Sequence, residues 1–171
     1  MFYKITAKDF ISPDPIFMND KKSLEENLKE KIREKYEGFV DKDLGIVISI
    51  LNIGNIKEGI YVPEDERFYF EVEFELLSFK PELNEIVYGI IDSVTTFGAF
   101  VNIGVIDALV HLSQLGDNKY EFKENKIVST DGKEVFKKGD KVKARITAIS
   151  YKETIPKVAL TMRQLGLGKI D

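Results

Sequence analysis

Residues 89–101 read GIIDSVTTFGAFV, and this stretch decides the fold of the C-terminal half of the 171-residue chain. Apolar residues stand among glycines, a pattern typical of short, bent strands with tight turns. Gly98 lies between Phe97 and Phe100, so we expect the backbone to turn sharply there and one or both rings to project from a sheet. Exposed rings on a small barrel stack unpaired bases, and the stretch therefore predicts a nucleic-acid site.

Further blocks follow the same pattern. Residues 107–113 read DALVHLS and contain the only histidine, His111; residues 136–146 read FKKGDKVKARI, and residues 157–162 read KVALTM. In this order the blocks resemble the RNA-binding repeat named after ribosomal protein S-one, an OB-fold variant, over roughly residues 83–163. The resemblance implies a small OB-fold barrel that binds single-stranded RNA.

By the same resemblance, Phe97, Phe100 and His111 are expected to contact RNA, with Lys157 as the basic residue at the last strand. The residues alone leave other interpretations open. Either phenylalanine could belong to the core, and His111 could cap a short turn. The chain also departs from the repeat after the penultimate strand, where residues 150–156 form a longer turn without the usual aspartate.

Basic residues gather in the last third of the chain. Residues 1–80 carry a net charge of −5, residues 81–118 contain no Lys or Arg and carry −5, and residues 119–171 carry +6. Lys141, Lys143 and Arg145 alternate with apolar residues, which puts the three cations on one face of a strand. We expect this face either to follow the phosphates of RNA or to be an ordinary solvated strand face.

Composition excludes several classes of site. A hydrophobic content of 43% with 32% charged residues is typical of a globular protein. With no cysteine and one histidine, the sequence predicts no disulfide, metal site or cofactor site. No apolar run reaches the ~20 residues of a membrane helix, and the N-terminus lacks the layout of a signal peptide. We therefore expect a cytoplasmic protein without membrane contact.

The N-terminal half predicts a β-α-β-β arrangement. Residues 2–8 and 44–51 are expected strands, the second buried on both faces, and residues 52–59 are an expected turn. A helix is expected from Ser23, which would form a capping box with Glu26, up to Gly38. Its Leu24, Leu28, Ile32 and Tyr36 would share one buried face.

Residues 67–79 show the clearest strand pattern, with strict alternation of apolar residues and glutamates. The glutamates Glu71, Glu73 and Glu75 would form a row on one face. Nothing nearby supplies the partners that paired catalytic carboxylates need, so we predict no catalytic residues and a solvated or protein-facing edge.

The whole chain resembles a family of archaeal RNA polymerase stalk subunits, those of the E type, which are the counterparts of the seventh subunit of the eukaryotic enzymes. The likeness lies in residues 34–38 (EKYEG), 41–47 (DKDLGIV), 74–81 (FELLSFKP) and 159–164 (ALTMRQ). Residues 63–66 (PEDE) depart from the family's glycine-flanked aspartate. The expected fold is α+β, with an N-terminal RNP-like domain over residues 1–81 packed on an S-one-type OB barrel over residues 82–171.

The resemblance implies a non-catalytic protein that forms a heterodimer with the second stalk protein of the RNA polymerase, the F subunit. It also implies docking on the polymerase core subunits through the N-terminal tip, and contact with nascent single-stranded RNA. Two alternatives from other classes remain. One is a purely structural assembly subunit that does not bind RNA. The other is a translation or RNA-processing factor with the same repeat, which would need nucleotide-binding or catalytic segments that this sequence lacks.

Overall fold

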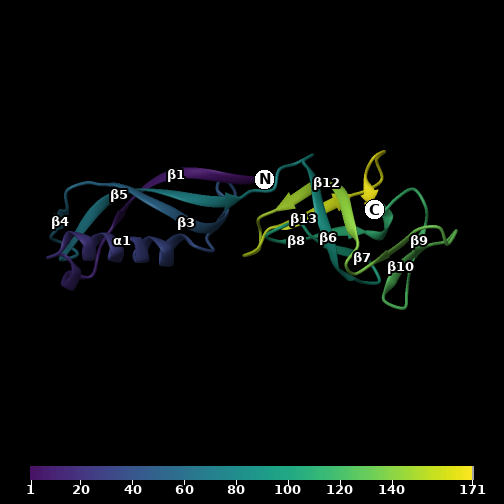
Figure 1. Ribbon diagram of the computed structural model, residues 1–171, viewed down its shortest axis with the longest axis horizontal. Helices are drawn as coiled ribbons and strands as arrows, with labels where there is room; N and C mark the ends of the chain where they lie inside the picture. The colour runs from purple at the N-terminus through teal and green to yellow at the C-terminus, as the bar shows by residue number, and fades with distance from the viewer. Residues whose placement is uncertain (171) are drawn as a thin grey trace. The chain divides into compact units, whose positions relative to one another are not determined.

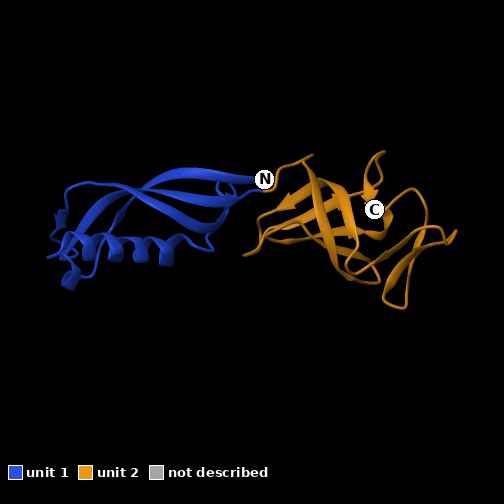
Figure 2. Ribbon diagram, in the orientation of Figure 1, with its two compact units in different colours: residues 1–80 blue, residues 81–171 orange. Residues whose placement is uncertain are grey.

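The computed structural model describes residues 1–170, which are mostly β-strands with one α-helix. The chain divides into two compact units, the first from Met1 to Lys80 and the second beginning at Pro81 (Figure 2). Within the described residues, no helix is long and apolar enough to cross a membrane.

Unit 1 is a sheet with a helix packed against it (Figure 1). The strand order is β1-β5-β3-β2, and β4 pairs with β5. Its elements are β1 (Phe2–Ile11), η1 (Pro15–Phe17), α1 (Lys21–Tyr36), β2 (Val40–Asp41), β3 (Gly45–Ile56), β4 (Ile60–Val62) and β5 (Arg67–Phe79).

The core of unit 1 lies between α1 and the sheet. Leu28 and Ile32 of the helix and Val72, Phe74 and Leu76 of β5 are fully buried. The predicted helix face and the alternation along β5 are thus confirmed. Burying these large side chains supplies most of the unit's stability, since each contributes about 1.5–3 kcal/mol.

The helix begins earlier than predicted. Asp20 is the N-cap, and its carboxylate accepts hydrogen bonds from the backbone N–H of Ser23 (3.1 Å) and from the Ser23 hydroxyl (2.7 Å). Ser23 therefore lies inside the first turn, and the predicted capping box with Glu26 is wrong. An aspartate caps a helix as well as a serine does, so from the sequence alone Asp20 and Ser23 were both suitable N-cap residues.

The expected turn at residues 52–59 is shorter than predicted, because β3 continues to Ile56 and only residues 57–59 connect it to β4. Three register irregularities between β3 and β5 absorb the turn-forming residues without ending the ladder. The Asn52 amide donates a hydrogen bond to Glu75 across the strands (3.0 Å). Ile46 and Ile48 stay partly exposed, so β3 is not buried on both faces as expected.

The glutamate row of β5 is neutralised by lysines of the neighbouring strands. Lys4 pairs with Glu75 at 2.8 Å and Lys8 with Glu73 at 3.4 Å, both from β1. Lys57, which follows β3, pairs with Glu71. This face of the sheet is therefore a ladder of alternating charges, not a set of free carboxylates.

Near the end of β1, Asp9 accepts hydrogen bonds from Lys35 Nζ (2.5 Å) and the Tyr36 hydroxyl (2.6 Å), which tie the strand to α1. Burial would raise the pKa of Asp9, but these hydrogen bonds lower it overall. Burial together with the Asp9 charge raises the pKa of Tyr36 to about 12.

Unit 2 contains a closed five-stranded barrel. The strands follow the order β13-β8-β7-β6-β12, and pairing of β12 with β13 closes the ring. The elements of this unit are β6 (Ile86–Val94), β7 (Gly98–Asn102), β8 (Asp107–His111), η2 (Leu112–Gln114), β9 (Tyr120–Lys123), β10 (Lys126–Ser129), β11 (Val135–Lys137), β12 (Lys141–Ser150), β13 (Lys157–Thr161) and β14 (Gly168–Lys169).

Residues 116–135 contribute to a second small sheet with the order β11-β10-β9. A turn at Asp131-Gly132 joins β10 to β11, and Gly132 there has φ +70°. A second turn at Glu124-Asn125, with φ of 47° and 60°, joins β9 to β10. Tyr120, Ile127 and Phe136 are buried and give this sheet its apolar contacts.

Candidate nucleic-acid interface

A row of side chains crosses the outer face of the barrel from strand to strand. Ser93 of β6 lies opposite Phe100 of β7, and Phe100 lies opposite Leu109 of β8. Leu109 is in register with Ala159 of β13, and Ala159 with Ala148 of β12. The residues on either side of Phe100 and Leu109 in sequence are buried, so these two side chains point outward.

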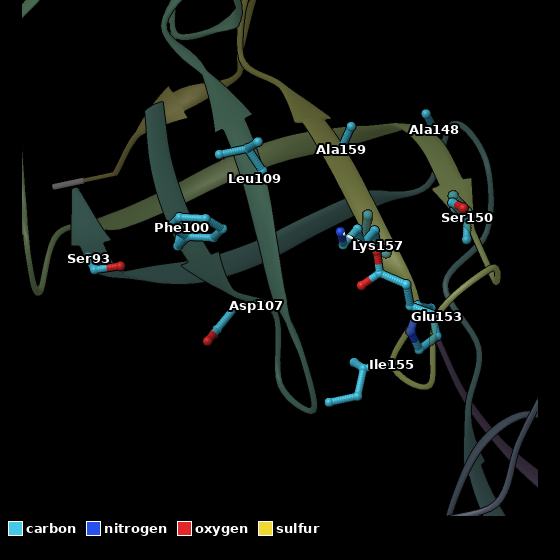
Figure 3. Close-up of a pocket in the computed structure, with 13 residues that line it drawn as sticks. Ser93, Phe100, Asp107, Leu109, Ala148, Ser150, Glu153, Ile155, Lys157 and Ala159 are labelled. Atoms are coloured by element: carbon cyan, nitrogen blue, oxygen red, sulfur yellow. Dashed lines mark hydrogen bonds and ion pairs between the residues drawn. The ribbon is translucent and has the colours of Figure 1, made fainter. Parts of the chain in front are cut away.

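This row forms the floor of a groove of about 720 Å³ (Figure 3). One wall comes from the turn between β12 and β13, which contributes Glu153, Ile155 and Pro156. The longer turn noted in the sequence thus builds a side of the groove. The floor is largely apolar, and its polar groups lie at the rim, an arrangement that suits the face of a planar ring better than a compact ion.

The ring of Phe97 is beside this groove. It is 47% exposed and meets the half-buried Phe100 ring edge to face, with 6.1 Å between ring centroids. A side chain at Gly98 would place its Cβ 2.3 Å from the carbonyl oxygen of Val110, so only glycine allows β7 and β8 to approach here. The backbone N–H of Leu112 donates a hydrogen bond to the Phe97 carbonyl (3.0 Å). This bond fixes the backbone from which the exposed ring projects.

His111 serves the structure as a cap. Its Nδ1 accepts a hydrogen bond from the backbone N–H of Ser113 (3.3 Å) and lies 2.9 Å from the Ser113 hydroxyl, at the start of η2. The side chain is exposed at the end of β8, opposite Gly98. Capping and base contact are therefore compatible, because the cap uses only one ring nitrogen.

The groove carries little net positive charge. Lys157 points across it (Figure 3) and pairs with Glu153 at 2.5 Å. Asp107 lies at the opposite rim and accepts a hydrogen bond from the Asn102 amide (2.9 Å). With two carboxylates and one paired cation in the lining, attraction for phosphate is weak, and ring contacts must supply most of any affinity.

The three cations of β12 lie elsewhere on the barrel. Lys141, Lys143 and Arg145 are in register with residues 86–90 of β6, and β14 pairs with the other edge of β12. The strand faces predicted from alternation are confirmed, since Val142, Ala144 and Ile146 are buried. The residues expected to contact RNA thus fall into two sets, one on β7, β8 and β13 and one beside β6.

Sequence reasoning missed Leu109, Ala148, Ala159 and Ile155, which line the groove. Leu109 and Ala159 could have been found from the alternation within β8 and β13, because each lies between two inward-facing residues. Ala148 could not, since a register irregularity between Ile146 and Ala148 shifts the pattern of β12.

Comparison with known proteins agrees with this arrangement. Residues 13–66 match the SHS2 domain found in the N terminus of Rpb7p/Rpc25p/MJ0397, and residues 80–159 match the S1 RNA binding domain. The chain is similar to DNA-directed RNA polymerase subunit Rpo7 of Saccharolobus solfataricus, with 41% identity over 88% of this chain and 86% of that protein.

Two further relatives extend the likeness. Rpo7 of Sulfolobus acidocaldarius is 34% identical over 100% of this chain and 94% of its own length. The RNA polymerase II subunit rpb7 of Schizosaccharomyces pombe is 28% identical over 85% of this chain and 86% of that protein. The chain belongs to the archaeal Rpo7 family of RNA polymerase subunits, whose eukaryotic counterparts include rpb7.

Proposed function

We propose that the chain is a non-catalytic stalk subunit of DNA-dependent RNA polymerase that forms a heterodimer with the F subunit, docks on the core enzyme and binds nascent single-stranded RNA in the cytoplasm. The observation that carries the RNA-binding part is the aromatic and apolar row on the outer face of the barrel, from Phe100 to Ala159, beside the exposed ring of Phe97.

The binding mode follows from the groove. Bases stack on aromatic rings regardless of sequence, because every base has a π-face. Phe97 and Phe100 supply two rings at 88° to one another, so one base would stack on the exposed Phe97 while its neighbour lies in the groove over Phe100. Since Lys157 is already paired with Glu153, we expect modest affinity and a shallow dependence on salt.

We place docking on the polymerase core at the end of unit 1 that carries β4, the end away from the N-terminus (Figure 1). Large apolar side chains are exposed there: Ile16 (78%), Ile60 (56%), Tyr61 (48%) and Phe68 (41%). Residues around η1 and around the β4–β5 turn line a common cavity of about 730 Å³. An exposed apolar cluster of this kind is typical of a protein–protein contact.

The ion pairs of the β5 glutamates support a non-catalytic role, because this row was the one considered as a set of paired catalytic carboxylates. Glu71, Glu73 and Glu75 are each paired with a lysine, so none is held as a free acid or base.

The test of RNA binding is fluorescence anisotropy of a labelled single-stranded RNA with the full chain. Phe97→Ala should weaken binding about 5- to 150-fold, the equivalent of about 1–3 kcal/mol for one stacked base. Phe68→Ala is the matched control, because Phe68 is a comparably exposed phenylalanine in unit 1. Equal RNA affinity for wild type and Phe97→Ala would reject the proposal and leave a purely structural assembly subunit.

A further inference from the structure

The charged groups at the rim of the groove are not arranged for phosphate. Its lining contains two carboxylates, Asp107 and Glu153, and one cation, Lys157. Glu153 already pairs with Lys157, whereas Asp107 forms no salt bridge within residues 1–170. An unpaired carboxylate repels phosphate, so the group that Asp107 faces in a bound RNA must be a hydrogen-bond donor.

The turn between β7 and β8 holds this carboxylate in place. The Asn102 amide donates a hydrogen bond to Asp107 Oδ1 (2.9 Å), and the backbone N–H of Gly104 donates one to Asn102 Oδ1 (3.1 Å). Gly104 has φ +118°, a conformation that glycine adopts readily and other residues rarely do. In the part of the chain that the structure describes, Asp107 Oδ2 accepts no hydrogen bond, so it is an oriented acceptor that is open to a ligand.

Asp107 lies within reach of a base on the groove floor (Figure 3). It pairs in register with Asn102, and Phe100 pairs with Leu109, so the two pairs are one step apart on the same face of β7 and β8. Residues two apart on a strand are separated by ~7 Å. A base stacked over Phe100 covers most of that distance, and a hydrogen bond of ~2.9 Å spans the rest.

A carboxylate at this position distinguishes bases by their Watson–Crick edges, which unpaired RNA leaves open. Guanine presents two adjacent donors there, N1–H and the 2-amino group, and cytosine and adenine each present an amino group. Uracil presents a single N3–H between two carbonyl oxygens, and a carboxylate repels those oxygens. Stacking does not make this distinction, because every base has a π-face.

We propose that the groove selects bases with an amino group on the Watson–Crick edge over uracil, and that Asp107 is the residue that reads this edge. Asn102 is then a positioning residue, because it acts only through the carboxylate that it holds. The inference rests on the proposed function, which supplies single-stranded RNA as the ligand, and adds a base preference to it.

The experiment measures the affinity of the full chain for short labelled RNAs by fluorescence anisotropy. In one matched pair uridine alternates with cytidine or with uridine itself; in the other it alternates with guanosine or with inosine, which lacks only the 2-amino group. Ring size is the same within each pair, so stacking is matched. Wild type should bind the cytidine and guanosine RNAs about 3- to 10-fold more tightly than their partners, the effect of one hydrogen bond at an exposed site.

The variants separate base reading from overall charge. Asp107→Asn keeps the shape of the side chain and should bring both affinity ratios to within about 2-fold of unity, and Asn102→Ala should lower them partway. Asp117→Asn is the control, because Asp117 is an 82% exposed carboxylate outside the groove lining, paired with Arg163. Losing a charge changes the affinity for all RNAs alike, so only loss of the base contact changes the ratios.

The outcomes distinguish this inference from the proposed function. Equal binding within each pair by wild type, or ratios that persist in Asp107→Asn, would overturn base reading by Asp107 and leave RNA binding intact. If wild type binds none of the RNAs, RNA binding itself fails and the inference with it. Thermal unfolding confirms that each variant is folded, and Asp107→Ser repeats the test if the amide disturbs the turn.

Discussion

Replacing Gly98 by alanine perturbs a point of close approach between β7 and β8, beside the aromatic rings. The added Cβ would lie 2.3 Å from the Val110 carbonyl oxygen and 3.0 Å from the Cα of His111. Ordinary van der Waals contact begins at 3.4 Å. Both neighbours are backbone atoms in a close-packed barrel, so the strands must separate by about 1 Å instead of a side chain moving aside.

The loss in free energy of unfolding can be estimated from the contacts that such a separation disturbs. Overpacking of a tight site costs about 1–3 kcal/mol. The hydrogen bond from Leu112 N–H to the Phe97 carbonyl (3.0 Å) bridges the same two segments. Weakening it adds about 1 kcal/mol, which gives a total of about 2–4 kcal/mol. For a unit of this size, that lowers the unfolding midpoint by roughly 10–30 °C.

The assay is differential scanning calorimetry of the full chain, with Gly54→Ala as the control. A Cβ at Gly54 would meet its nearest atom, the Glu73 carbonyl oxygen, at 3.3 Å, so this variant should unfold within a few degrees of wild type. The affinity of Gly98→Ala for RNA should fall as well, because the backbone that carries the Phe97 ring shifts. A Gly98→Ala protein that unfolds at the wild-type temperature would refute the close approach.

Two further predictions concern single hydrogen-bonded groups. The pKa of Asp9 lies below its ordinary value of 3.8 because hydrogen bonds from Lys35 and Tyr36 outweigh its burial, so its stabilisation is present above about pH 4 and is lost as pH falls through the lowered pKa. Urea unfolding of Asp9→Asn should therefore depend less on pH between about 5 and 2.5 than wild type does; an equal slope would contradict this. The Tyr120 hydroxyl, which is buried, donates to Glu134, and Tyr120→Phe should lower the free energy of unfolding by about 1–2 kcal/mol. An unchanged urea midpoint would mean that this hydrogen bond contributes nothing.

Sequence patterns predicted the elements whose side chains alternate without interruption. The strand at residues 67–79 and the helix face from Leu24 to Tyr36 were predicted correctly because burial there follows the period of the backbone. The predicted strand at residues 44–51 ended too early, because Gly54 and Asn55 favour turns locally. In the structure, the irregular ladder to β5 keeps both residues in β3. Pairing with a neighbouring strand overrides local preference, and a single sequence does not show that pairing.

The candidate site was likewise predicted only in part. The glycine between two phenylalanines predicted rings near the surface, and the exposure of Phe97 confirms this for one ring. What the pattern could not supply was register between distant strands. The Leu109–Ala159 pair builds the groove floor, and the Lys143–Tyr88 pair puts the basic strand beside β6, yet the partners are 50 and 55 positions apart. Strand faces follow from alternation, but neighbours follow only from topology.

The measurement that addresses the central claim most directly is a methyl NMR titration of the full chain with single-stranded RNA. Resonances of Leu109 and Ala159, on the groove floor, should shift as RNA is added, while those of Ile86 and Ile90 on β6 should stay in place. Shifts confined to the two isoleucines, or no shift at any of the four residues, would contradict RNA binding on the face formed by β7, β8 and β13.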